Sequence, residues 1–260
     1  MGRSLLDDCI PRVRRRTVLA AVPLLAPVAH AAKTGQGAPV DIHLVSDAWH
    51  DLTRADGTGL YFDLIRAASA RAGIRQVRIQ ILPYARSVGM VRDKRADAWV
   101  ASFLNEQDFP LYPKWHFDRN AQVVLYRADA AGSFQGRESL RQRRVAWLRG
   151  FGLDRYIQVP MQVTEIDTIA SAFAMLERRR IEFFVGARSD LEDHVRAAKV
   201  DMASYRVEFL MHLGLYLAFA DTARGAALRG IWDQQMEVLH KDPAFLAIYK
   251  KYDYDVPFEP

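Results

Sequence analysis

The pattern of hydrophobic and polar positions changes period repeatedly along residues 40–103. Alternating positions, typical of a strand, give way to an apolar stripe at helical spacing, formed by Tyr61, Leu64, Ile65, Ala68 and Ala72 and closed by Gly73. The predicted elements are strand 40–46, helix 60–72, strand 76–82, helix 85–93 and strand 96–103. This order is a β-α-β-α-β unit, in which right-handed crossover helices join parallel strands.

The same succession returns farther along the chain. Its predicted elements are strand 144–148, helix 153–157, strand 161–164, helix 168–179 and strand 181–185. Residues 120–127 are expected to form a strand that leads from the first unit to the second. Two further strands, 207–210 and 213–220, and two helices, 222–239 and 243–252, are predicted to complete the chain.

Two such units predict two α/β lobes. Because ligands bind outside the carboxyl ends of parallel strands, the loops at those ends are where functional residues are expected. These loops are residues 47–59, 83–86, 103–108, 149–152 and 186–190.

The first 31 residues have the pattern of a targeting segment. Four arginines, at 12, 14, 15 and 16, precede an apolar run over 18–29, which the A-x-A sequence of residues 29–31 follows. We predict a signal peptide over 1–31, cleaved after Ala31, a polar tether over 32–39, and a periplasmic location. Arg15 and Arg16 precede Thr17, Val18 and Leu19 in a way that resembles a twin-arginine signal, although the general secretory route remains open.

Composition and charge narrow the classes of function. The chain has 260 residues, of which 50% are hydrophobic and 26% charged, as in a globular protein. Its net charge is +5, but residues 1–31 hold five arginines and two aspartates, so the remainder has 31 basic and 29 acidic side chains, a net charge of +2. We therefore expect no nucleic acid partner. The single cysteine, Cys9, also lies in residues 1–31, which excludes thiol chemistry and disulfides from the processed chain.

Five stretches resemble, in order, motifs of the periplasmic solute-binding proteins of family 3, the polar amino acid type. They are GLYFDL at 59–64, YARSVGMVRDKRADA at 84–98, LRQRRVA at 140–146, LERRRIEF at 176–183 and PAFLAIYKKY at 243–252. The resemblance spans residues 40 to 254.

This resemblance implies an α/β fold of the two-lobe, type II binding-protein class, each lobe a parallel-rich sheet with flanking helices. Lobe one would comprise residues 40–125 and 213–260, and lobe two residues 126–212. The implied function is capture of a small-molecule ligand between the lobes and its delivery to the membrane permease of an ABC importer. It further implies a monomer that is not an enzyme and needs no cofactor or metal.

Two positions depart from the family pattern. Gln107 stands where amino-acid binders have an arginine for the ligand α-carboxylate, and a neutral amide cannot form that bidentate ion pair. The acidic residue that takes the ligand ammonium would fall within residues 186–190, where Asp190 lies slightly late. The expected ligands therefore extend from amino acids to organic acids and other small polar or anionic solutes.

The candidate ligand-binding residues come from the loops defined above. They are Trp49, Tyr61, Tyr84, Arg86, Ser102, Asn105, Arg149 and Arg188. The aromatic rings would stack on a ligand, Ser102 and Asn105 would form neutral hydrogen bonds, and Arg149 with the following G-F-G turn would hold an anion. Each also has an ordinary structural explanation, such as core packing, a surface ion pair or loop capping. Arg86, Arg149 and Arg188 facing one cleft would indicate an anionic ligand; otherwise a neutral polar solute is expected.

Two other functions remain open. An enzyme on the same scaffold, such as a dehydratase, would need a cleft carboxylate, for which Glu106, Asp108 and Asp190 are the candidates. A sensory protein would report the bound ligand to a membrane receptor. Asp190 and His194 have metal-ligand spacing, but a solvated helix start explains them better.

Overall fold

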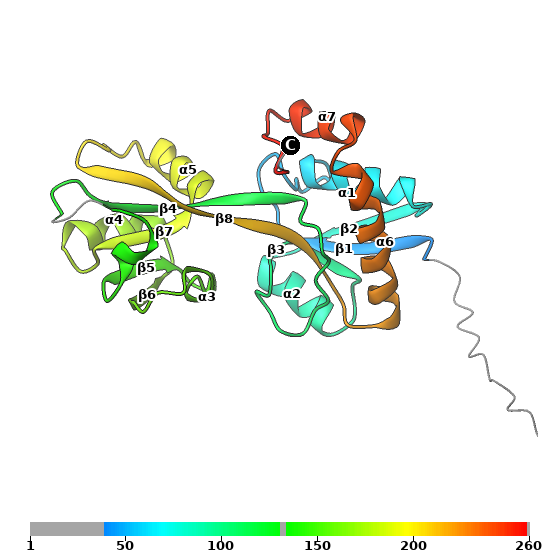
Figure 1. Ribbon diagram of the computed structural model, residues 1–260, viewed down its shortest axis with the longest axis horizontal. Helices are drawn as coiled ribbons and strands as arrows, with labels where there is room; N and C mark the ends of the chain where they lie inside the picture. The colour runs from blue at the N-terminus through cyan, green and yellow to red at the C-terminus, as the bar shows by residue number, and fades with distance from the viewer. Residues whose placement is uncertain (1–38, 131–133, 259–260) are drawn as a thin grey trace, which may run out of the picture. The chain divides into compact units, whose positions relative to one another are not determined.

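The computed structural model of the protein describes residues 39–130 and 134–258 (Figure 1). The predicted signal peptide and all but the last residue of the tether lie outside this part of the chain, so both stay predictions. The described part is a mixed α/β structure built on one eight-stranded sheet, with strand order β2-β1-β3-β8-β4-β7-β5-β6. This confirms the predicted α/β class.

The first predicted unit is confirmed at one end of the sheet. It consists of β1 (Asp41–Ser46), α1 (Leu60–Arg71), β2 (Gln76–Ile81), α2 (Tyr84–Arg92) and β3 (Ala98–Phe103). β1 pairs in parallel with both β2 and β3. The apolar stripe of α1 packs into the core, because Leu60, Leu64 and Ile65 are fully buried.

A single glycine sets the start of α1. Gly59 has a φ of +132°, which L side chains rarely adopt. A Cβ atom there would lie 2.4 Å from the carbonyl oxygen of Leu52. Glycine is therefore required where the loop after β1 turns into the helix.

The second predicted unit is confirmed at the other end. It consists of β5 (Arg144–Leu148), α3 (Asp154–Ile157), β6 (Gln162–Ile166), α4 (Ile169–Glu177) and β7 (Phe183–Ala187), preceded by the 3-10 turn η1 (Arg137–Leu140). β5 pairs in parallel with β6 and β7. Thr168 caps α4 by accepting a hydrogen bond from the backbone N–H of Ser171.

Two long antiparallel strands, β4 (Asp118–Arg127) and β8 (Tyr205–Phe219), connect the two units (Figure 1). β8 pairs with β3 on one side, and β4 pairs with β7 on the other. The prediction of two separate strands over 207–210 and 213–220 is wrong. Met211 and His212 interrupt the hydrophobic alternation, and the register with β4 shifts at a bulge that leaves Leu210 unpaired, but residues on both sides of the bulge pair with β4, so the backbone continues as one strand.

The remaining helices are α5 (Arg188–Ala198), α6 (Ala223–Leu239) and α7 (Pro243–Lys251). α6 and α7 pack against α1, and Asp242 caps α7 by accepting from the N–H groups of Ala244 and Phe245. α5 corrects the expectation of a loop over 186–190, because β7 extends to Ala187 and the helix begins at the next residue. No helix within residues 39–130 and 134–258 is long and apolar enough to cross a membrane.

Candidate functional site

Side chains that follow β1 and β2 meet at the carboxyl ends of these parallel strands. Asp47, directly after β1, accepts a hydrogen bond from the backbone N–H of Tyr84 at 2.9 Å through Oδ2. Its Oδ1 accepts from the N–H of Ala48 at 2.7 Å. The Asp47 carboxylate therefore ties the loop after β1 to the start of α2.

A carboxylate from the loop after β3 occupies the centre of this region. The Glu106 oxygens lie 2.7 and 2.9 Å from the Tyr84 hydroxyl. One of them, Oε2, also accepts from Ser102 Oγ at 3.0 Å and from the backbone N–H of Phe103 at 3.1 Å. Oε1 has only the Tyr84 contact among the described residues. Glu106 is thus fixed in orientation and keeps acceptor capacity on one oxygen.

The hydroxyl groups around Glu106 have further partners. Trp99 Nε1 donates to the Tyr84 hydroxyl at 3.2 Å, and Ser102 Oγ lies 3.1 Å from the Tyr112 hydroxyl. Burial, together with the charge of Glu106, raises the pKa of Tyr84 well above its usual value. Tyr84 therefore stays a neutral donor at physiological pH.

Trp49 lies beside this polar group. Its ring centroid is 6.0 Å from that of Tyr84, with the planes tilted by 56°. Its position is set by a tight turn in which the N–H of Trp49 donates to the carbonyl oxygen of Thr53 at 3.1 Å. The partly exposed indole is therefore available for stacking beside the Tyr84 ring, whose hydroxyl contacts Glu106.

Residues of the second unit contact the same loop. Arg155 on α3 donates from Nη1 to the carbonyl oxygens of Asn105 and Glu106, both at 2.7 Å. The Tyr156 hydroxyl donates to the carbonyl oxygen of Leu104 at 3.0 Å. Asn105 has a φ of +57°, a conformation that asparagine tolerates better than most residues. The loop after β3 is therefore hydrogen-bonded to the helix that follows β5.

An aromatic contact accompanies these hydrogen bonds. The Phe103 ring lies 5.9 Å from the Tyr156 ring and 6.4 Å from the Phe151 ring, centroid to centroid. Burial raises the pKa of Tyr156 above its usual value. Apolar and polar groups of the two units thus meet at the carboxyl ends of β3 and β5.

The three candidate arginines have different surroundings. Arg86, in the first turn of α2, is exposed, and its guanidinium makes no ion pair or hydrogen bond with any described residue. Arg149 Nε donates to Asp167 at 2.8 Å, and its Nη1 lies 3.5 Å from Glu165. Arg188 lies 3.6 Å from Glu192 on its own helix. Of these three arginines, only Arg86 has no carboxylate partner in the part of the chain that the structure describes.

The turn after β5 is also occupied by the chain itself. The backbone N–H of Gly150 points to Glu165 Oε1 at 3.3 Å, on the neighbouring strand β6. The anion that the sequence led us to expect at Arg149 and this turn is thus supplied by carboxylates of β6 and the loop after it.

Tyr61 lies apart from the other candidates. Its side chain is 2% exposed, and its hydroxyl donates to Asp118 Oδ2 at 2.6 Å. The ring packs edge-on against Phe117 at 4.9 Å. The structure brings together Trp49, Tyr84 and Ser102, leaves Asn105 exposed in the loop that carries Glu106, and places Tyr61 in the core.

Four residues of this region were not among the candidate ligand-binding residues. They are Asp47, Glu106, Arg155 and Tyr156. Glu106 was considered only as a possible catalytic carboxylate, and Asp47 falls in a loop that the strand pattern singled out. No feature of the sequence distinguishes Arg155 from the other arginines near it.

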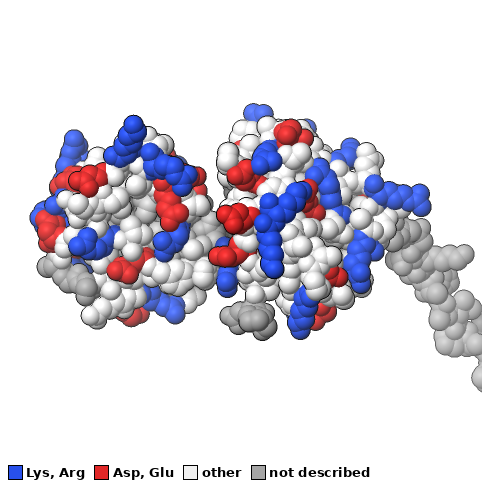
Figure 2. All heavy atoms as spheres, turned by 90° about the horizontal axis from the view of Figure 1, so that it is seen from above, with Lys and Arg blue, Asp and Glu red and all other residues white. Residues whose placement is uncertain are grey.

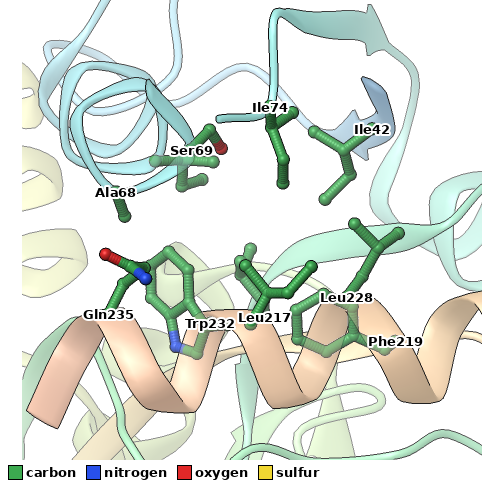
Figure 3. A pocket seen from close by; sticks show the side chains of 11 residues that line it. Ile42, Ala68, Ser69, Ile74, Leu217, Phe219, Leu228, Trp232 and Gln235 are labelled. Atoms are coloured by element: carbon green, nitrogen blue, oxygen red, sulfur yellow. The ribbon is translucent and has the colours of Figure 1, made fainter. Parts of the chain in front are cut away.

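The other cavities, side-chain clusters and surfaces of the described structure are weaker candidates for a functional site. A pocket of about 20 Å³ between α1 and α6 is almost entirely apolar, and Figure 3 shows Ala68 and Ser69 on one side of it and Trp232 and Gln235 on the other. That volume is about the space of one water molecule, so it reflects helix packing.

No group of three His, Cys, Asp or Glu side chains within residues 39–130 and 134–258 is placed to hold a metal. On the face in Figure 2, basic and acidic side chains are interspersed.

Comparison with known proteins identifies the fold. No protein-family model and no curated protein match the sequence. A substrate-binding protein of an ABC uptake transporter from Streptococcus pneumoniae, solved with bound histidine, is 16% identical, with a TM-score of 0.58; the alignment covers 84% of this chain and 95% of that one.

Two arginine-binding proteins also have similar folds at low sequence identity. A mutant of ArgBP from T. maritima is 15% identical, with a TM-score of 0.56 over 82% of this chain and 95% of that one. An ancestral arginine-binding protein bound to glutamine is 14% identical, with a TM-score of 0.56 over 83% and 99%. The chain therefore has the two-lobe, type II periplasmic binding-protein fold, in agreement with the family 3 resemblance of its motifs.

Proposed function

We propose that this chain is an exported solute-binding protein that captures a small polar or anionic solute, an amino acid or an organic acid, between its two lobes. The observation that carries the proposal is the convergence of Trp49, Tyr84 and Glu106 at the carboxyl ends of the first three strands. In open α/β sheets this edge is where ligands bind. The structural similarity to solute-binding proteins supports the same assignment.

The chemistry of the site suggests how the solute is held. Glu106 would accept a hydrogen bond from an ammonium or hydroxyl group of the solute through Oε1, and Arg86 would pair with a carboxylate. Trp49 and Tyr84 would contact its apolar part. A molecule with a donor group and a carboxylate, such as an amino acid or a hydroxy acid, suits this combination.

The loop after β3 belongs to the proposed lobe one, residues 40–125 with 213–260, and α3 to the proposed lobe two, residues 126–212. The hydrogen bonds of Arg155 and Tyr156 to residues 104–106 would then join the lobes. Because bound solute would contact both lobes, it would favour the closed conformation through its higher affinity for that state.

Export and delivery complete the proposal. Residues 1–31 would direct the chain to the periplasm and be removed, and the loaded monomer would dock on an ABC-type permease. Uptake of the identified solute, measured in cells with and without this protein, separates transport from sensing. A sensory role predicts unchanged uptake with altered signalling, and a catalytic role predicts that the solute is converted to product by the pure protein.

The direct test is a thermal-shift screen of residues 32–260 against amino acids, organic acids and small peptides. A solute that raises the melting temperature of the protein, and loses this effect in Glu106→Gln, supports the proposal. Glu138→Gln, an exposed carboxylate paired with Arg141, is the matched control. Absence of stabilisation across the whole library would argue against solute binding.

A further inference from the structure

A second polar pocket lies at the opposite ends of the same strands. Its volume is about 190 Å³, and its wall includes Asp41 at the start of β1, Arg78 on β2 and Asp97 just before β3. β1 has six residues, so the pocket is about 17 Å from the carboxyl ends at which Asp47 and Glu106 lie. It is therefore separate from the proposed solute site.

The two carboxylates of this pocket are already paired. Arg224, from α6, donates through Nε to Asp97 Oδ1 at 2.8 Å and through Nη2 to Asp97 Oδ2 at 3.2 Å. The same Nη2 lies 3.2 Å from Asp41 Oδ1, and Asp97 Oδ2 also accepts from the backbone N–H of His43 at 2.8 Å. The carboxylates thus hold Arg224 and the strand ends in place.

Three more cations line the pocket without such partners. Arg78, Lys94 and Arg95 are exposed, and their side chains make no ion pair or hydrogen bond with any described residue. Together with Arg224 they carry four positive charges, whereas Asp41 and Asp97 carry two negative charges, so the pocket has an excess charge of +2. The cations that line the pocket therefore outnumber the carboxylates that could neutralise them.

These cations come from two separate segments that the fold brings together. Arg78 is the register partner of His43 across β1 and β2, so both side chains lie on one face of the sheet. Lys94 and Arg95 follow α2 in a turn closed by backbone hydrogen bonds to Val91 and Met90. A strand and a turn thus direct guanidinium and ammonium donors to one space.

We propose that this pocket binds a phosphate group, either as free inorganic phosphate or as the headgroup of an anionic lipid. Guanidinium groups match the geometry of phosphate oxygens, and an ammonium adds a compact charge. A phosphate dianion would balance the excess of +2 and relieve the mutual repulsion of Arg78, Lys94 and Arg95. Because the pocket is distant from Glu106, its occupation does not depend on the proposed solute-binding function.

The test compares the purified protein with two triple variants of equal charge. Arg78→Gln, Lys94→Gln and Arg95→Gln remove the pocket cations; Arg71→Gln, Arg75→Gln and Arg92→Gln remove three exposed arginines of the same unit that do not line it. Each protein is melted in inorganic phosphate and in sodium chloride of the same ionic strength. Binding to phosphatidylglycerol and to phosphatidylcholine vesicles is measured by co-sedimentation.

Phosphate about tenfold above its Kd should raise the melting temperature of the natural sequence and the control variant by roughly 3 to 6 °C. The pocket variant should lose this shift. Vesicle binding that requires phosphatidylglycerol and is lost only in the pocket variant also supports the site and identifies a lipid source. The proposal is overturned if sodium chloride gives the same shift, if both triple variants respond alike, or if neither phosphate nor vesicles bind.

Discussion

The Tyr84 hydroxyl lies 2.7 Å from one oxygen of Glu106 and 2.9 Å from the other. Tyr84 begins the helix after β2, whereas Glu106 belongs to the loop after β3, so this contact fixes two strand ends relative to each other. Because the Tyr84 hydroxyl carries no charge, the Glu106 carboxylate is oriented without being neutralised.

Glu106→Gln should weaken binding of the solute by about 10- to 100-fold, because a hydrogen bond to a charged group contributes about 1.5–3 kcal/mol. Titration calorimetry measures this loss. Circular dichroism should show an intact fold, and Glu138→Gln should bind normally. Unchanged affinity in Glu106→Gln would remove this carboxylate from the site.

Arg86→Gln should lower affinity for solutes that carry a carboxylate by about tenfold and leave neutral analogues unaffected, since the substitution removes a charge that has no partner among residues 39–130 and 134–258. Arg92→Gln, at the other end of α2, is the control and should bind both classes normally. Comparing each acid with its amide by calorimetry measures the effect. Equal losses for acid and amide would contradict a charge-pairing role.

The buried Asp118 should make stability depend on pH. Burial raises the pKa of this carboxyl to about 6 in the folded protein, against a usual value of 3.8. The folded state therefore binds the proton more tightly, so this group's contribution to stability is fully present below about pH 4 and lost as the pH rises through about 6. Relative to an unperturbed aspartate, ionisation costs roughly 3 kcal/mol at pH 7.5.

Urea unfolding of the natural sequence and of Asp118→Asn measures the contribution of Asp118 to the free energy of unfolding. The free energy of unfolding of the natural sequence should rise by roughly 2.5 kcal/mol relative to the variant between pH 7.5 and pH 4. Tyr61→Phe, which removes the hydroxyl that donates to Asp118, should increase the pH dependence. A constant difference between the natural sequence and Asp118→Asn would show that Asp118 does not titrate in this range.

Gly59→Ala should destabilise the protein by more than about 2 kcal/mol, because the new Cβ would lie 2.4 Å from the Leu52 carbonyl oxygen. Gly73→Ala is the control: its φ is +78°, but a Cβ there meets no atom within 4 Å. It should cost only about 1 kcal/mol. Equal losses on thermal unfolding would attribute the effect to backbone conformation alone.

Most of the fold could be predicted from the sequence because its signals are local. The change from alternating to helical spacing located both β-α-β-α-β units, and Gly73 marks the end of α1 because glycine readily adopts its positive φ of 78°. Tyr61 belongs to the apolar stripe of α1, so the same pattern already indicated the buried position that the structure gives it. The single strand β8 was missed because local alternation fails at His212, whereas pairing with β4 continues on both sides of the bulge at Leu210.

The sequence by itself determined the type and order of nearly all elements and the edge of the sheet at which to look for a site. The partners of its polar groups were decided only by the tertiary structure. Arg149 is engaged by Asp167, whereas Arg86 has no carboxylate partner within the described chain, and nothing in their local sequences distinguishes them. The physical reason is that periodicity reports which face of an element is buried, but a hydrogen bond or ion pair depends on distances between segments that only folding brings together.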